Sequence, residues 1–244
     1  MSGVTRFKNR TAAGELLAQL LGAYFALEDV VVLALPRGGV PVGFAVAQVL
    51  DAPLDVRLVR KLGVPGQEEL AMGAIASGNV CIVQPSVIDA LGISPEIIEA
   101  VAQREEREIE RREKSYRANH PPLSAHGRIA ILVDDGLATG ATMRAAVHAL
   151  RREHPRKIVI AIPLASVQAY HDLKLEADEI MCLMTPEPFH AVGIWYEDFQ
   201  QTTDEEVKDL LEKSRHQIIS VPRDAGGRES PTGLDRARDR TKLG

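Results

Sequence analysis

The sequence predicts one α/β domain with a mostly parallel β-sheet flanked by helices. Apolar, mostly β-branched runs recur along the chain, and several of them are separated by segments of helical periodicity. Strands of a parallel sheet are buried on both faces and form such continuous apolar runs, and their alternation with helices is typical of βαβ units. The 244 residues, of which 45% are hydrophobic, can bury the core of one such domain. Strands are expected at residues 30–35, 54–59, 129–133, 158–164 and 179–184.

The expected helices lie before, between and after these strands. The first lies within residues 9–28, where Asn9 and Thr11 are residue types that cap helices and leucines follow at helical spacing. Residues 95–117 begin with a proline and become almost wholly charged, with Glu and Arg often three or four residues apart, which favours a solvated helix in an insertion at about 86–118. The remaining helices are expected at residues 40–50, 140–153, 166–176 and 203–214.

Two further segments stand outside this alternation. The short runs "AMGAIASG" and "NVCIVQ" meet at Gly78-Asn79, a pair suited to a tight turn, which predicts a hairpin that projects from the sheet. Residues 220–244 contain few large apolar side chains and are expected to form a mobile tail. The domain itself is therefore expected to comprise residues 1–219.

Composition argues against several classes of partner. The formal net charge of -5 and the pI near 5.8 give no basic footprint for nucleic acid. Cys81 and Cys182 lack metal-type spacing, which argues against a zinc site or a disulfide framework. The N-terminal residues lack the apolar region of a signal peptide, and no apolar run reaches the roughly 18 residues of a membrane span, so we expect a cytoplasmic protein.

A pair of acids follows the run at residues 129–133, in the segment "ILVDDGLATGATM". Asp134 and Asp135 lie just beyond the carboxyl end of this strand, where open α/β sheets bind ligands. Adjacent acids repel unless polyol hydroxyls or a hydrated Mg²⁺ compensates their charge. In the following "ATGAT", backbone N–H groups at a helix start and the hydroxyls of Thr139 and Thr142 can bind a phosphate. A site for a phosphorylated sugar is expected; the alternative is a helix cap beside a packing glycine.

This segment resembles the phosphoribosyl diphosphate (PRPP) motif of type I phosphoribosyltransferases, "VLVDD-x-x-x-TG-x-T", across its whole length. More narrowly, the chain is similar to a bacterial group of predicted phosphoribosyltransferases, including its "EPFHAVGIWYEDFQQTTDEEV" segment. The resemblance implies the type I phosphoribosyltransferase fold and Mg²⁺-dependent transfer of a phosphoribosyl group from PRPP to an acceptor. It implies that Asp134 and Asp135 hold the ribose hydroxyls and Mg²⁺. PRPP contacts are expected from Gly136 and Leu137, with Ala138, Thr139, Gly140, Ala141 and Thr142 around the 5′-phosphate.

A second motif, "ALPRGGVPVG", follows the run at residues 30–35. Its glycine spacing fits neither a Walker A loop nor G-x-G-x-x-G. Gly38 and Gly39 allow a tight turn that presents backbone N–H groups, and Arg37 adds a fixed guanidinium for anionic oxygens. In the family, this position carries the diphosphate loop. A plain turn with a solvated arginine is the alternative.

A third motif, "VRKLGVPGQEELAMGAI", resembles the family's flexible catalytic loop. Arg60 and Lys61 precede a segment rich in Gly and Pro, and closure would exclude water and bring both cations to the leaving diphosphate. Lys61 to Leu70 is expected to form a hinged lid rather than a regular element. Basic surface residues ahead of a turn would give the same pattern.

Aromatic residues gather after the last expected strand. A hood at about residues 185–214 could stack a planar acceptor on Phe189, Trp195 and Tyr196, with His190 beside them. Local packing of these rings, together with Phe199, is the alternative reading.

The residue at position 138 bears on the acceptor. Purine-salvage relatives carry an acid there that can exchange a proton with the purine ring, whereas this chain has Ala138. The sequence leaves the acceptor open, and it leaves open a regulator that binds PRPP or a nucleotide without turnover and a PRPP or nucleotide hydrolase. Family members are commonly dimers, so a homodimer is expected.

Overall fold

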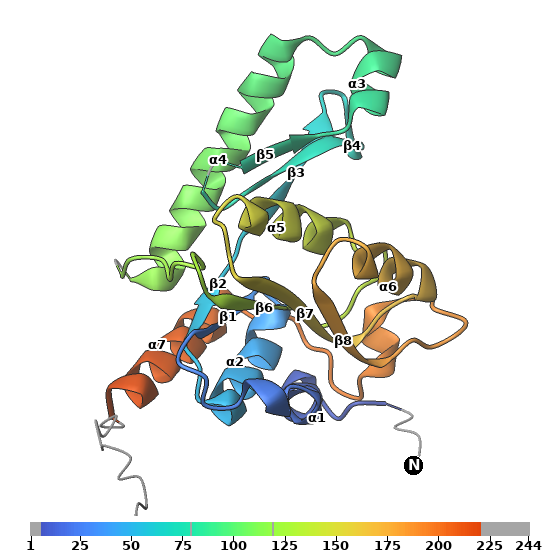
Figure 1. Cartoon of the computed structure of the whole chain (residues 1–244). Helices are drawn as coiled ribbons and strands as arrows, with labels where there is room; N and C mark the ends of the chain where they lie inside the picture. Colours follow the sequence, from blue (N-terminus) through green and yellow to red (C-terminus); the bar gives the residue numbers. More distant parts are fainter. Residues whose placement is uncertain (1–5, 79, 119, 221–244) are drawn as a thin grey trace, which may run out of the picture.

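The computed structural model describes residues 6–78, 80–118 and 120–220, and the expected mobile tail lies almost wholly outside these ranges. Figure 1 shows a parallel sheet between two layers of helices and a smaller sheet that projects from them. Within the described ranges, no helix is long and apolar enough to cross a lipid bilayer.

The main sheet confirms the predicted α/β class. Its strands are β1 Val30–Ala34, β2 Leu54–Val56, β6 Ile129–Val133, β7 Lys157–Leu164 and β8 Glu179–Met184. All five are parallel, in the order β2-β1-β6-β7-β8. The helices that flank them are α1 Arg10–Leu20, α2 Gly39–Leu50, α5 Ala141–Arg151, α6 Val167–Lys174 and α7 Asp204–Ser220. Because both faces of the sheet are apolar, both are covered: α1, α2 and α7 lie on one face and α5 and α6 on the other (Figure 1).

The second sheet corrects two expectations. Strand β3 (Val59–Val64), β4 (Gln67–Ala76) and β5 (Val80–Val83) are antiparallel, which confirms the predicted hairpin between β4 and β5. The strand expected at 54–59 is instead divided, because Leu58 leaves the main sheet and its N–H and C=O groups bond to Ser77. The segment expected to be an irregular lid is a β-hairpin with a tight turn at Gly66, where φ is +79°.

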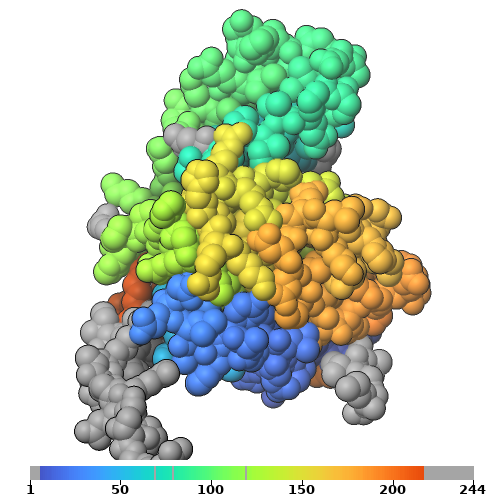
Figure 2. All heavy atoms as spheres, viewed as in Figure 1, coloured from blue at the N-terminus to red at the C-terminus, as the bar shows by residue number. Residues whose placement is uncertain are grey.

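The insertion covers the second sheet. After α3 (Pro85–Leu91), the charged helix α4 (Pro95–Arg117) packs on β3, β4 and α7. Its inner face buries Val101, Ile109 and Tyr116, so it is not solvated on all sides. In Figure 2 most of the teal and green atoms lie above the yellow and orange atoms of the molecule and touch the yellow ones. The second sheet and the insertion therefore form a lobe that begins just beyond the carboxyl end of β2.

Candidate functional site

The first two motifs meet where β1 and β6 end. These strands are parallel neighbours in register, with Ala34 opposite Val133, so their carboxyl ends lie side by side. A Cβ atom at Gly38 would lie 2.0 Å from Asp135 Oδ2, and one at Gly39 would lie 2.7 Å from the Val133 carbonyl oxygen. Both glycines are needed because the loop touches the acid pair, a packing requirement that adds to the turn chemistry expected from the sequence.

Each carboxylate of the pair has one oxygen held in place. Asp134 Oδ1 accepts a hydrogen bond from the Asp135 N–H at 2.8 Å, and Asp135 Oδ2 accepts one from Arg10 Nε at 2.8 Å. The second oxygen of each carboxylate receives no hydrogen bond from the described residues. These two open oxygens can accept hydrogen bonds from a ligand.

Burial makes the charge on this pair costly. Desolvation raises the pKa of Asp134 well above its ordinary value, and the neighbouring Asp135 charge raises it further. Desolvation also raises the pKa of Asp135, while the Arg10 guanidinium opposes that rise. Arg10 offsets the negative charge of the two carboxylates only in part. A cation, or a ligand that donates hydrogen bonds, would stabilise the rest of this charge.

Arg10 is a site residue that the sequence analysis missed. Besides Asp135, it donates from Nη1 to the Gln200 carbonyl oxygen at 2.7 Å, and its guanidinium lies 3.8 Å from the centre of the Phe199 ring. These partners are up to 190 positions away in the chain. The sequence carries one indication, since a cation at the first residue of a helix opposes the helix dipole.

The expected phosphate loop is held from behind by the end of β7. Leu137 N–H donates to the Leu164 carbonyl, and Ser166 donates to the carbonyls of Leu137 and Ala138 through its N–H and its hydroxyl. Gly140, with φ of +72°, turns the chain into α5. Thr139 and Thr142 are exposed at the start of that helix, as a phosphate site there requires. Gly136 and Ala141 complete the stretch.

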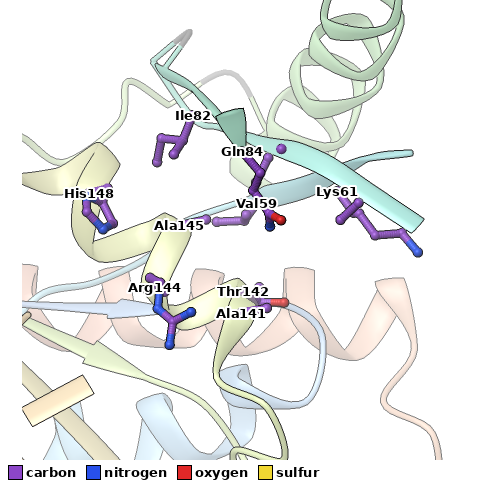
Figure 3. Close-up of a pocket in the computed structure, with 12 residues that line it drawn as sticks. Val59, Lys61, Ile82, Gln84, Ala141, Thr142, Arg144, Ala145 and His148 are labelled. Atoms are coloured by element: carbon purple, nitrogen blue, oxygen red, sulfur yellow. The ribbon is translucent and has the colours of Figure 1, made fainter. Parts of the chain in front are cut away.

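The three expected cations lie in different surroundings. Arg37 is 3.8 Å from Asp204 of α7, and Arg60 is bound to the buried Glu105 of α4 at 2.6 Å. Lys61 and Thr142 line the same cavity of about 390 Å³ between α5 and the second sheet, and Figure 3 shows them projecting from β3 and from the start of α5. Lys61 therefore lines the same cavity as Thr142 of the expected phosphate loop, and Arg60 pairs with Glu105 of the insertion.

The aromatic residues of the expected hood form a packed cluster. Phe189, Trp195 and Phe199 are partly buried around Tyr196, which is only 3% exposed and stacks on Phe199 with ring centres 5.0 Å apart. The Tyr196 hydroxyl donates to the Asp135 carbonyl oxygen at 2.6 Å. Tyr196 thus has no face open to an acceptor in this structure and supports the acid pair from behind. His190 is exposed.

Replacing Tyr196 by Phe is expected to lower the free energy of unfolding by about 1–2 kcal/mol, because the Asp135 carbonyl loses its buried donor. Urea denaturation would measure this loss. Tyr170→Phe is the matched control, since the Tyr170 hydroxyl makes no hydrogen bond within the described ranges. Equal losses in the two variants would contradict a role for the hydroxyl bond.

Comparisons with known proteins identify the family to which the chain belongs. The family model of the phosphoribosyl transferase domain matches residues 7–182. Two proteins from two strains of Mycobacterium tuberculosis, which carry the provisional name phosphoribosyl transferase, are 44% identical over 215 residues, covering 88% of this chain and 48% of each relative. This chain therefore spans about half their length. A protein of known crystal structure from Thermus thermophilus is 42% identical, with a TM-score of 0.76 over 85% of this chain and 98% of that one. The chain belongs to the type I phosphoribosyltransferase family.

Proposed function

We propose that the chain is a phosphoribosyltransferase that uses PRPP and Mg²⁺ and releases diphosphate. The acid pair carries the proposal, because each of its carboxylates keeps one oxygen without a hydrogen bond from the described residues. The ribose 2′- and 3′-hydroxyls are donors that suit these oxygens. The exposed helix start at Thr139–Thr142 then takes the 5′-phosphate.

Mg²⁺ fits the donor set of the pair. Carboxylate oxygens are ligands that Mg²⁺ prefers. Burial raises the pKa of Asp134 and Asp135 and so disfavours their charged forms, which a bound cation would stabilise. Asp134 and Asp135 would hold the ion directly, through water or through the ribose hydroxyls. When bound, the ion would supply charge neutralisation for the diphosphate. Within the described ranges, no group of three or more His, Cys, Asp or Glu side chains is arranged to hold a metal by itself.

The protein's share of the reaction is positioning and charge stabilisation. The acceptor attacks ribose C1 and the bond from C1 to diphosphate breaks, through an oxocarbenium-like state. A ribose held in a fixed orientation lowers the entropic part of the barrier to this attack. The backbone N–H groups at Gly38 and Gly39 and the side chains of Arg37 and Lys61 are the donors proposed for the leaving diphosphate. Arg37 Nη1 lies 3.8 Å from Asp204 Oδ1, which is beyond hydrogen-bond distance, so this ion pair is weak.

Diphosphate release from PRPP, measured with and without a panel of bases and amines, tests this function. A transferase releases diphosphate only when an acceptor is present. A regulator that binds PRPP releases none, and a hydrolase releases it without any acceptor. Removal of Mg²⁺ with a chelator is expected to stop the release. Release that is independent of the acceptor, or absent with every acceptor while PRPP binds, would contradict the proposal.

The acceptor is predicted not to be a purine used at ordinary salvage rates. Ala138 can neither give nor take a proton, and loss of a positioned acid or base costs roughly 10²- to 10⁴-fold in rate. Its carbonyl is occupied by the Ser166 hydroxyl at 2.7 Å. Radiolabelled PRPP assayed with adenine, hypoxanthine, guanine, xanthine, uracil and orotate would check this. Rapid formation of any purine nucleotide would overturn the prediction, and Ala138→Asp would show whether the position matters.

A further inference from the structure

We propose that Arg10 is a positioning residue for the ribose site, holding Asp135 so that one carboxylate oxygen faces the sugar. This inference rests on the proposed function, because it concerns how the same acid pair would bind ribose. Arg10 lies far from the family motifs in sequence and reaches them only in the folded chain. Its proposed action is indirect, through Asp135.

Arg10 is fixed by three different contacts. Its Nε donates to Asp135 Oδ2 at 2.8 Å, and its Nη1 donates to the Gln200 carbonyl at 2.7 Å. Its Cζ atom lies over the Phe199 ring, 3.8 Å from the ring centre. The side chains of Arg10 and Asp135 are only 11% and 14% exposed. A planar guanidinium held in this way has one orientation, which it imposes on the carboxylate.

Helix α1 gains nothing electrostatically from this arginine. Arg10 is the first residue of α1, where the positive end of the helix dipole disfavours a cation. The helix already has a cap, because the Asn9 side chain accepts from the Ala12 N–H at 2.9 Å. The Arg10 charge is unfavourable at the start of its own helix and is stabilised by partners far away in the chain. Such conflicts between local structure and the fold are expected at functional sites.

Asp135 is restrained from three directions. Arg10 holds Oδ2, Gly38 lies against the same carboxylate, and the Tyr196 hydroxyl holds the backbone carbonyl. Rotation of the carboxylate would break its bond to Arg10, so Oδ1 remains the oxygen available to a ribose hydroxyl.

A merely structural role makes a different prediction. Arg10 also joins the start of α1 to the segment around Gln200, so its loss could lower stability alone. A structural clamp would leave the relative affinities of sugars with and without a hydroxyl unchanged. A positioning residue would change them, because its effect reaches the ligand through one hydroxyl.

The test is calorimetric binding of ribose 5-phosphate and of its 2-deoxy and 3-deoxy forms to wild type and Arg10→Gln. In wild type, each missing hydroxyl is expected to weaken binding by about 10-fold or more. In Arg10→Gln, removing the hydroxyl that binds Asp135 is expected to weaken sugar binding by less than about 3-fold. If removing either hydroxyl weakens binding to Arg10→Gln as much as it weakens binding to wild type, the proposal is wrong. If wild type does not bind ribose 5-phosphate at all, the proposed function fails instead.

Two further variants keep the test decisive. Arg10→Lys keeps the charge but cannot reproduce the fork that reaches Asp135 and Gln200, and it serves if Arg10→Gln does not fold. Weaker binding with a reduced hydroxyl effect in Arg10→Lys supports the proposal, and wild-type values of both contradict it. Arg151→Gln is the matched control, because Arg151 pairs with the exposed Asp178 at 2.8 Å. Its hydroxyl effects are expected to equal those of wild type; a reduction as large as that in Arg10→Gln would overturn the proposal.

Discussion

Replacing Gly38 by Ala is expected to abolish most PRPP binding, even though alanine is compatible with the backbone at this position. The Gly38 dihedral angles are φ -60° and ψ -33°, so the added methyl causes no conformational strain. It would lie 2.0 Å from Asp135 Oδ2 and 2.6 Å from Cγ. Asp135 cannot simply move aside, because Arg10 holds it. Either the carboxylate or the loop must shift, and an overpacked site of this kind costs about 1–3 kcal/mol.

Calorimetry with PRPP and Mg²⁺ would measure this loss as an affinity at least about 10-fold weaker, which corresponds to about 1.4 kcal/mol. Gly22→Ala is the matched control, since no atom lies within 4 Å of a Cβ built there. The control is expected to bind PRPP like wild type. If Gly38→Ala also binds like wild type, the two loops do not form one site.

The double substitution Asp134→Asn/Asp135→Asn is expected to remove the stabilisation that PRPP and Mg²⁺ give to the fold. A ligand bound only by the native state stabilises it by about 2.7 kcal/mol at 100 times its dissociation constant. Asn keeps the size of each side chain but loses the charge and half of the acceptor capacity. Differential scanning fluorimetry, with and without PRPP, would show a shift in wild type and little or none in the variant. A wild-type shift in the variant would contradict the ribose assignment.

Without ligand, the stability of the same double variant is expected to depend less on pH than that of wild type. Burial raises the pKa of both acids, so the folded state binds protons more tightly than the unfolded state. For such groups, stability falls as the pH rises from the ordinary aspartate range through the folded pKa, and it stays reduced above it. The neutral variant lacks this loss. Urea denaturation from pH 4 to 8 should show a decline in wild type that is smaller in the variant; an equal decline would assign the effect to other groups.

The parallel sheet could be predicted because each of its strands is defined by its own residues. The run at 30–35 is buried on both faces in the structure and needs no distant partner to be recognised. The division near Leu58 could not be predicted, since it depends on the bonds between Leu58 and Ser77. The hairpin from Lys61 to Leu70 could not be predicted for the same reason, because its Gly and Pro residues indicate a turn without showing that strands flank it.

The candidate site also has parts that could be predicted from the sequence and parts that could not. The acid pair and the glycine pair are local motifs, and the fold brings them together as adjacent strand ends require. Arg10, the packing of Tyr196 against Asp135 and the engagement of Arg60 with Glu105 all join positions far apart in the chain. The homodimer, the acceptor and the roles of the individual site residues stay predictions.

The central claim is that a phosphoribosyl group is transferred at the Asp134-Asp135 site. The most direct measurement supplies PRPP labelled at ribose C1, with Mg²⁺ and an acceptor panel, and follows labelled product and free diphosphate together. We expect wild type to form both in equal amounts with at least one acceptor, and Asp134→Asn/Asp135→Asn to form neither. Labelled ribose 5-phosphate in place of a transfer product, or equal transfer by the double variant, would contradict the claim.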